Sequence, residues 1–304
     1  MGKNNILAIQ TKLNDRSNGQ PLRVLTEKEF AFWQENGYVI VKNAVNREDL
    51  ERLTKLIWEF AEKDPNDPST WYQEPDTEMK MKELTGAGMV ELYHHQLMWN
   101  NRTSEKIYHA FVDIWGTEKL WTSIDRVNLN LPKKNGKGAD GFIHWDVDTS
   151  LDPLPVNVQG VLSLVDTTID MGGFQCVPEL FRDFPEWVKT QAKDRDPYHP
   201  DLEGYEPTKI VTEAGDLLIF NSMQPHGIRA NNSNSARLAQ YISMFPAQED
   251  DQELKEARIA SWRDKTPPVG DAFPGDPRKW EQKYHERAIL TDLGEKLLGS
   301  RSWD

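Results

Sequence analysis

The sequence is poor in cysteine, in long apolar runs and in positive charge, and each shortage excludes a class of protein. Cys176 is the single cysteine among 304 residues, which excludes an internal disulfide and any metal site built from several cysteines. A run of about 20 apolar residues, as a membrane-spanning helix requires, does not occur. Lys and Arg number 36 against 49 Asp and Glu, a net charge of −13. This balance argues against nucleic acid or an anionic membrane as partner.

Apolar residues make up 38% of the chain, which is enough for one sizeable core. We expect residues 1–25 to be a polar N-terminal segment, since they hold no apolar run typical of a signal peptide, and we expect a cytoplasmic protein. Residues 26–250 are expected to form one domain that begins with helices. The charged residues 251–304 are expected to add a helical extension packed on the same domain.

Two helices and a strand are predicted at the start of this domain. Thr26 with Glu29 three residues later has the pattern of a capping box, and Gly37 is a typical helix end. Residues 38–41 (YVIV) have the composition of a strand. Asn46 is a candidate cap for a second helix, because apolar residues follow it with a period of 3.6.

The middle of the chain alternates between short apolar runs and turn residues. The runs are 158–165, 174–177, 209–212, 216–220 and 238–245, most of them separated by Pro or Gly. Many short strands with turn signals favour a β-barrel or β-sandwich over βαβ units. Residues 71–84 and 182–208 are predicted to be long irregular stretches, which often serve as binding loops.

A candidate metal site lies in the segment His144-Trp145-Asp146. On an extended chain, residues i and i+2 point to the same face, so this imidazole and this carboxylate can reach one point. His226 is the best candidate for a third ligand, and two His with one carboxylate form the facial triad of non-haem Fe(II) oxygenases. Arg237 follows His226 by 237 − 226 = 11 residues. Its guanidinium can bind a carboxylate through two hydrogen bonds, as a dicarboxylate cosubstrate would require.

This ordered set resembles the phytanoyl-CoA dioxygenase family of Fe(II)/2-oxoglutarate-dependent oxygenases. The resemblance covers most of residues 26–246. It includes HWD at 144–146, PHG at 225–227 and Arg237, together with 27–43 (EKEFAFWQENGYVIVKN), 172–178 (GGFQCVP) and 215–220 (GDLLIF).

The resemblance implies a mainly β fold with flanking helices, a double-stranded β-helix (jelly roll, cupin-like) with the metal in its mouth. Fe(II) would be held by His144, Asp146 and His226. The cosubstrate 2-oxoglutarate would chelate the iron and pair its far carboxylate with Arg237, and O₂ would take the remaining site. Related enzymes hold 2-oxoglutarate with polar side chains on two strands, which here implies Asn128 and Ser163. The products would be succinate, CO₂ and a hydroxylated small or medium organic metabolite.

The substrate itself is not specified by these motifs. Trp145, Thr149, Tyr72 and Tyr198 are candidates for the substrate pocket, because they flank the metal motif or lie in the long loops. Arg229 is expected to face solvent. A small-molecule substrate is expected, with no nucleic-acid or membrane partner, in a monomer or homodimer. The alternative function is that of a non-oxidative jelly-roll metal-binding protein or isomerase of the cupin kind.

Overall fold

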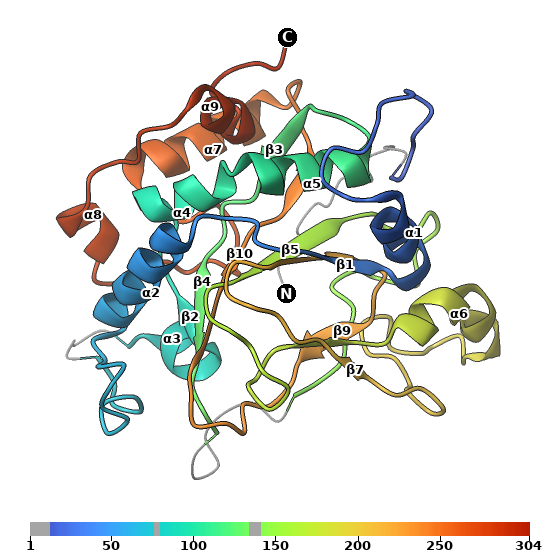
Figure 1. The fold of residues 1–304 in the computed structure, drawn as a ribbon, viewed down its shortest axis with the longest axis horizontal. Coiled ribbons are helices and arrows are strands. Elements are labelled where there is room, and N and C mark those ends of the chain that lie inside the picture. The colour runs from blue at the N-terminus through green and yellow to red at the C-terminus, as the bar shows by residue number, and fades with distance from the viewer. Residues whose placement is uncertain (1–12, 76–79, 134–140) are drawn as a thin grey trace.

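The computed structural model describes residues 13–75, 80–133 and 141–304. A six-stranded antiparallel sheet lies at its centre (Figure 1). Its strands, in spatial order, are β1 (Tyr38–Val41), β8 (Leu217–Asn221), β5 (Val158–Ser163), β10 (Arg237–Tyr241), β4 (Val127–Asn130) and β2 (Met89–Val90). A three-stranded sheet contains β7 (Thr208–Lys209), β6 (Phe174–Cys176) and β9 (His226–Ile228). A third, two-stranded sheet pairs β11 (Met244–Pro246) with β3 (Leu120–Thr122).

The large sheet has two apolar faces because side chains alternate along each strand. On β5, Val158 and Leu162 belong to the main core, which the sheet shares with helices. Val161, on the other face, packs with Phe174 and Cys176 of the three-stranded sheet. The inner face of the large sheet is therefore covered by the small sheet, and the outer face by helices. The expected mainly β core with flanking helices is confirmed, and its sheets are antiparallel.

The first helices begin and end where the sequence indicates. α1 (Glu27–Asn36) has a complete capping box between Thr26 and Glu29, and Gly37 ends it in the left-handed conformation with φ 69°. α2 (Arg47–Ala61) is capped by Asn46 and buries its apolar stripe in the main core. Three more helices follow before the large sheet is complete. They are α3 (Lys82–Ala87), α4 (Gln96–Arg102) and α5 (Glu105–Trp115).

One helix was not expected. Residues 182–208 are predicted to be irregular, yet α6 (Pro178–Thr190) occupies the first part of this stretch. Pro185 inside the helix hides the pattern, because proline normally ends a helix. The helix forms because Pro178 suits its first turn and because Leu180, Phe184 and Trp187 bury one face.

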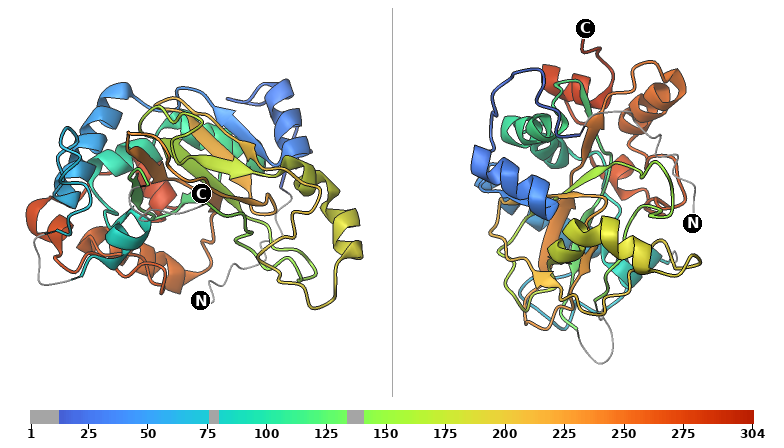
Figure 2. Two further views of the ribbon diagram at one scale, coloured as in Figure 1. Left: turned by 90° about the horizontal axis from the view of Figure 1, so that it is seen from below. Right: turned by 90° about the vertical axis from the view of Figure 1, so that its right-hand side faces the viewer.

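The C-terminal residues pack on the same body as the sheets. α7 (Gln252–Asp264) and α9 (Asp292–Leu298) lie near α4 and α5, whereas α8 (Trp280–Tyr284) lies near α2, where Trp280 packs against Phe60 (Figure 1). Figure 2 shows these orange and red helices on the same body from two further sides. The buried Arg258 donates hydrogen bonds to the carbonyls of Thr122, Leu297 and Leu298, so it ties α7 and α9 to β3. No helix in the described ranges is long and apolar enough to cross a bilayer.

Candidate metal centre and its cavity

The two halves of the candidate metal site are joined by backbone hydrogen bonds. His226 is the first residue of β9, and the N–H of His144 donates to its carbonyl at 2.8 Å. The N–H of His226 donates back to the carbonyl of His144 at 3.0 Å, which makes an antiparallel bridge. Residues 82 positions apart (226 − 144) in the sequence therefore present adjacent imidazoles, with ring centroids 4.7 Å apart.

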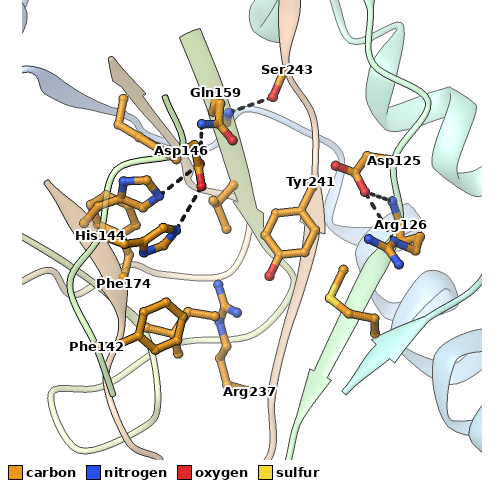
Figure 3. A pocket seen from close by; sticks show the side chains of 17 residues that line it. Asp125, Arg126, Phe142, His144, Asp146, Gln159, Phe174, Arg237, Tyr241 and Ser243 are labelled. Atoms are coloured by element: carbon orange, nitrogen blue, oxygen red, sulfur yellow. Dashed lines mark hydrogen bonds and ion pairs between the residues drawn. The ribbon is translucent and has the colours of Figure 1, made fainter. Parts of the chain in front are cut away.

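The three candidate ligands converge on one point (Figure 3). His144 Nε2 lies 2.9 Å from Asp146 Oδ1, and His226 Nε2 lies 3.4 Å from Asp146 Oδ2. One ligand atom from each residue lies within 4.8 Å of the others. The structure thus brings together all three residues that the sequence singles out.

The donor atoms are those that Fe(II) accepts in a facial triad. His226 Nδ1 lies 3.0 Å from the carbonyl oxygen of Gln224, so this nitrogen carries the proton and Nε2 presents a lone pair. That lone pair faces the Oδ2 atom of Asp146. Two acceptors therefore face each other, and a cation bound between them would interact favourably with both. Burial alone would raise the pKa of Asp146, but the contacts with the imidazoles of His144 and His226 and the hydrogen bond from Gln159 outweigh it and hold this pKa below its ordinary value.

Gln159 is a functional candidate that the sequence analysis missed. Its Nε2 donates to Asp146 Oδ2 at 2.7 Å, so the amide orients the carboxylate from behind. The sequence holds one sign of this role: in the strand 158–163, Gln159 and Val161 alternate with residues on the other face, which puts the Gln159 side chain on the inner face of the sheet. Only the packing of the two sheets shows that Gln159 and Asp146 meet.

The triad opens into a cavity of about 340 Å³ between the large and small sheets. Arg237, at the start of β10, is 3% exposed and lines this cavity. Its guanidinium points into the space beside the imidazoles (Figure 3). Phe142, Phe174 and Phe220 supply much of the apolar wall. A fixed cation and a metal triad in one apolar cavity can bind a molecule with two acidic ends.

Asn128 and Ser163 lie on the inner face but behind the cavity wall. Both are opposite Ala239 of β10, Asn128 from β4 and Ser163 from β5. The Oδ1 atom of Asn128 accepts a hydrogen bond from Arg237 Nη1 at 3.3 Å. Ser163 instead bonds the hydroxyl of Thr212 at 2.7 Å. The structure therefore assigns Asn128 a part in holding Arg237 and gives Ser163 a contact away from the cavity.

The four substrate-pocket candidates lie elsewhere. Trp145 is 1% exposed and packs against Phe184 and Trp187, because strand alternation turns it away from both neighbouring ligands. Thr149 is buried and donates to the carbonyl of Pro197. Tyr72 donates to the carbonyl of Pro132, and Tyr198 lies on the surface.

None of these four residues lines the cavity in the described part of the chain. The cavity wall is formed by aromatic and polar side chains of other segments.

Arg229 was expected to face solvent, and this was wrong. It is 4% exposed, and it donates to the carbonyls of Thr168, Ile169 and Phe174. Burial lowers its pKa to about 10, and the nearby Arg237 contributes to the shift. The polar loop sequence around Arg229 gave no sign that backbone carbonyls would enclose the side chain.

The far part of the cavity wall was predicted only at Arg126, which alternation along the strand places on the same face as Asn128. This part also contains Asp125 and Tyr241, while Ser243 lies beside Gln159 (Figure 3). Tyr241 lies on the same face of β10 as Arg237 and opposite Val161 of β5. These residues come to line one cavity through the pairing of distant strands, and no local sequence pattern reveals that pairing.

Comparison with known proteins agrees with this geometry. The family model described as phytanoyl-CoA dioxygenase (PhyH) matches residues 33–239. A protein of Aspergillus versicolor named Ava biosynthesis cluster protein O is 26% identical over 69% of this chain and 74% of its own. A 2-aminoethylphosphonate dioxygenase from the uncultured bacterium HF130_AEPn_1 is 22% identical over 90% of this chain and 98% of its own.

Solved structures show the same fold at low sequence identity. A putative oxidoreductase of Salmonella typhimurium LT2 superposes with a TM-score of 0.65 at 16% identity, over 93% of this chain and 88% of its own. The epimerase SnoN, solved with Fe³⁺, alpha-ketoglutarate and nogalamycin RO, superposes with a TM-score of 0.51 at 16% identity, over 73% of this chain and 83% of its own. Because the family model spans more than half of the residues, the chain belongs to the phytanoyl-CoA dioxygenase family.

Proposed function

We propose that this protein is an Fe(II)- and 2-oxoglutarate-dependent dioxygenase on a double-stranded β-helix. It hydroxylates a small or medium organic metabolite and releases succinate and CO₂. One observation carries the proposal: two imidazoles, one carboxylate and the buried guanidinium of Arg237 face the same cavity. Family membership and the dioxygenase name of the relative from the uncultured bacterium support it.

The chain's own residues position the reactants. His144, Asp146 and His226 would hold the metal, which when bound supplies the activation of O₂ and the oxidation of the cosubstrate. Gln159 fixes the orientation of the Asp146 carboxylate through its hydrogen bond at 2.7 Å. Arg237 would bind the far carboxylate of 2-oxoglutarate, with Asn128 holding the guanidinium from the neighbouring strand.

Aromatic side chains enclose the His226 side of the triad, while the side chains of His144 and Asp146 are 23% and 38% exposed. The His226 ring packs between Phe174, stacked at a centroid distance of 5.6 Å, and Phe220 at 4.4 Å. Such aromatic contacts fix the imidazole plane and lower the local dielectric, which strengthens the charge interactions of ligands and cosubstrate.

The test is consumption of 2-oxoglutarate by purified protein supplied with Fe(II) in air. We expect slow formation of succinate without added substrate, loss of it on chelation of iron, and loss of it in Asp146→Ala. Asp264→Asn, an exposed surface change on α7, is the matched control and should behave as wild type. Tight metal binding without any succinate would support the non-oxidative alternative instead.

A further inference from the structure

The charged residues at the far end of the cavity are not used by the reaction described above. Once the triad and Arg237 are assigned to metal and cosubstrate, Asp125 and Arg126 are the charged residues left in the described cavity wall. Both come from the segment that enters β4, and they lie across Tyr241 from the triad (Figure 3). This is the part of the cavity where a substrate can meet charged protein groups.

Negative charge is in excess there. Arg126 lies within 4 Å of three carboxylates: Glu91 at 2.9 Å, Asp125 at 3.6 Å and Glu83 at 3.9 Å. Arg102 lies behind this group, and its guanidinium donates hydrogen bonds to the backbone carbonyls of Tyr93 and Asp125. The guanidinium of Arg126 is thus one cation against three carboxylates.

Arg126 is fixed in place and does not swing toward a ligand. Glu91 binds its Nη1 atom, and the ring of Phe273 packs under the guanidinium at 4.7 Å. The Glu91 carboxylate is itself held by the N–H of Gly275 and the hydroxyl of Tyr93. Arg126 is 7% exposed, and its Nε has no hydrogen-bond partner among the described residues.

Asp125 keeps free acceptor capacity. Its Oδ1 atom accepts a hydrogen bond from the backbone N–H of Arg126 at 2.6 Å and lies 3.6 Å from Arg126 Nε. Its side chain is 28% exposed and lines the cavity, while burial raises the pKa of this carboxyl. A carboxylate can accept about four hydrogen bonds, so Asp125 can still bind a donor.

We propose that the substrate carries a protonated amine that binds the carboxylate of Asp125 while the carbon to be oxidised faces the metal; this rests on the proposed dioxygenase function. An ammonium group offers three donors and adds a cation beside these carboxylates. Tyr241 and Ser243 line the same cavity, but the Tyr241 hydroxyl points toward Arg237 and the Ser243 hydroxyl accepts from the N–H of Gly160 at 3.3 Å, so Asp125 is the acceptor offered to the ammonium group (Figure 3). A substrate with an acid group at this end would meet a guanidinium already surrounded by carboxylates.

The test uses small probes of matched shape on the anaerobic enzyme with Fe(II) and 2-oxoglutarate. Hexylamine and benzylamine are compared with hexanol, benzyl alcohol, hexanoate and benzoate. Each probe is titrated while the visible charge-transfer band is recorded, and binding is measured separately by calorimetry. We expect the amines to shift the band and to bind more tightly than the matched alcohols and acids.

Asp125→Asn keeps the shape and removes the charge. We expect it to weaken amine binding by roughly tenfold to a hundredfold, the factor for one hydrogen bond to a charged group. The band with 2-oxoglutarate alone should persist, and alcohol binding should not change. Asp264→Asn is the control for the loss of one surface carboxylate.

The outcomes separate this inference from the proposed function. Absence of the band in wild-type protein contradicts the dioxygenase assignment itself. A normal band with no response to amines, a stronger response to acids or alcohols, or equal amine binding in Asp125→Asn overturns the amine proposal alone.

Discussion

Replacement of Arg237 by methionine removes the cation proposed to bind the far carboxylate of 2-oxoglutarate. The guanidinium is 3% exposed and has one described protein partner, Asn128 at 3.3 Å, so most of its donors remain for a ligand. Each hydrogen bond between charged groups contributes about 1.5–3 kcal/mol, and a guanidinium can make two to one carboxylate. The loss of both is about 3 kcal/mol or more, which raises the Kd of 2-oxoglutarate roughly a hundredfold or more.

Arg237→Lys separates charge from geometry. Lysine keeps the positive charge but loses the planar pair of donors, so we expect the Kd to rise only about tenfold. The assay is an anaerobic titration of the Fe(II) protein with 2-oxoglutarate, followed by the charge-transfer band. Arg258→Lys serves as control, because this buried arginine binds carbonyls of the C-terminal extension and does not line the cavity.

The reasoning is refuted if Arg237→Met binds 2-oxoglutarate as tightly as the wild type. It is also refuted if Arg258→Lys weakens cosubstrate binding as much as Arg237→Met does. Melting temperatures of all variants show whether a change in Kd reflects the site or a general loss of structure.

Three further predictions address the metal support, the core and the pH dependence of stability. Gln159→Leu removes the hydrogen bond to Asp146 and should weaken iron binding by roughly tenfold to a hundredfold in a metal titration, with an unchanged melting temperature. Trp145→Ala should cost about 3–5 kcal/mol in chemical denaturation, yet leave the Kd of 2-oxoglutarate unchanged if its role is packing. Burial lowers the pKa of His94 to about 3, so protons bind the unfolded state first. The contribution of His94 to stability should therefore fall by about 1.4 kcal/mol per pH unit between pH 6.5 and about 3, measured as the difference in pH dependence between the wild type and His94→Gln.

The metal centre and Arg237 could be predicted because their signals are local. Residues i and i+2, such as His144 and Asp146, share a face on any extended segment. His226 and the arginine 11 residues after it have the order and spacing of the family motif. The position of Trp145 could be predicted as well. Because Trp145 lies between two ligands on an extended segment, alternation turns its side chain away from the cavity.

The far wall of the cavity could not be predicted in the same way. Asp125, Tyr241 and Gln159 line one cavity because β4, β10 and β5 pair in one sheet, and strand register depends on contacts between residues far apart in the sequence. α6 was missed for a different reason. Pro185 is a local signal against a helix, and burial of the apolar face of α6 overrides it.

The most direct test of the central claim is the visible spectrum of the anaerobic protein after Fe(II) and 2-oxoglutarate are added. The convergence of His144, Asp146 and His226 predicts a weak charge-transfer band in the wild type and its loss in His226→Ala. A wild type without the band, or a His226→Ala variant that retains it, would contradict the account.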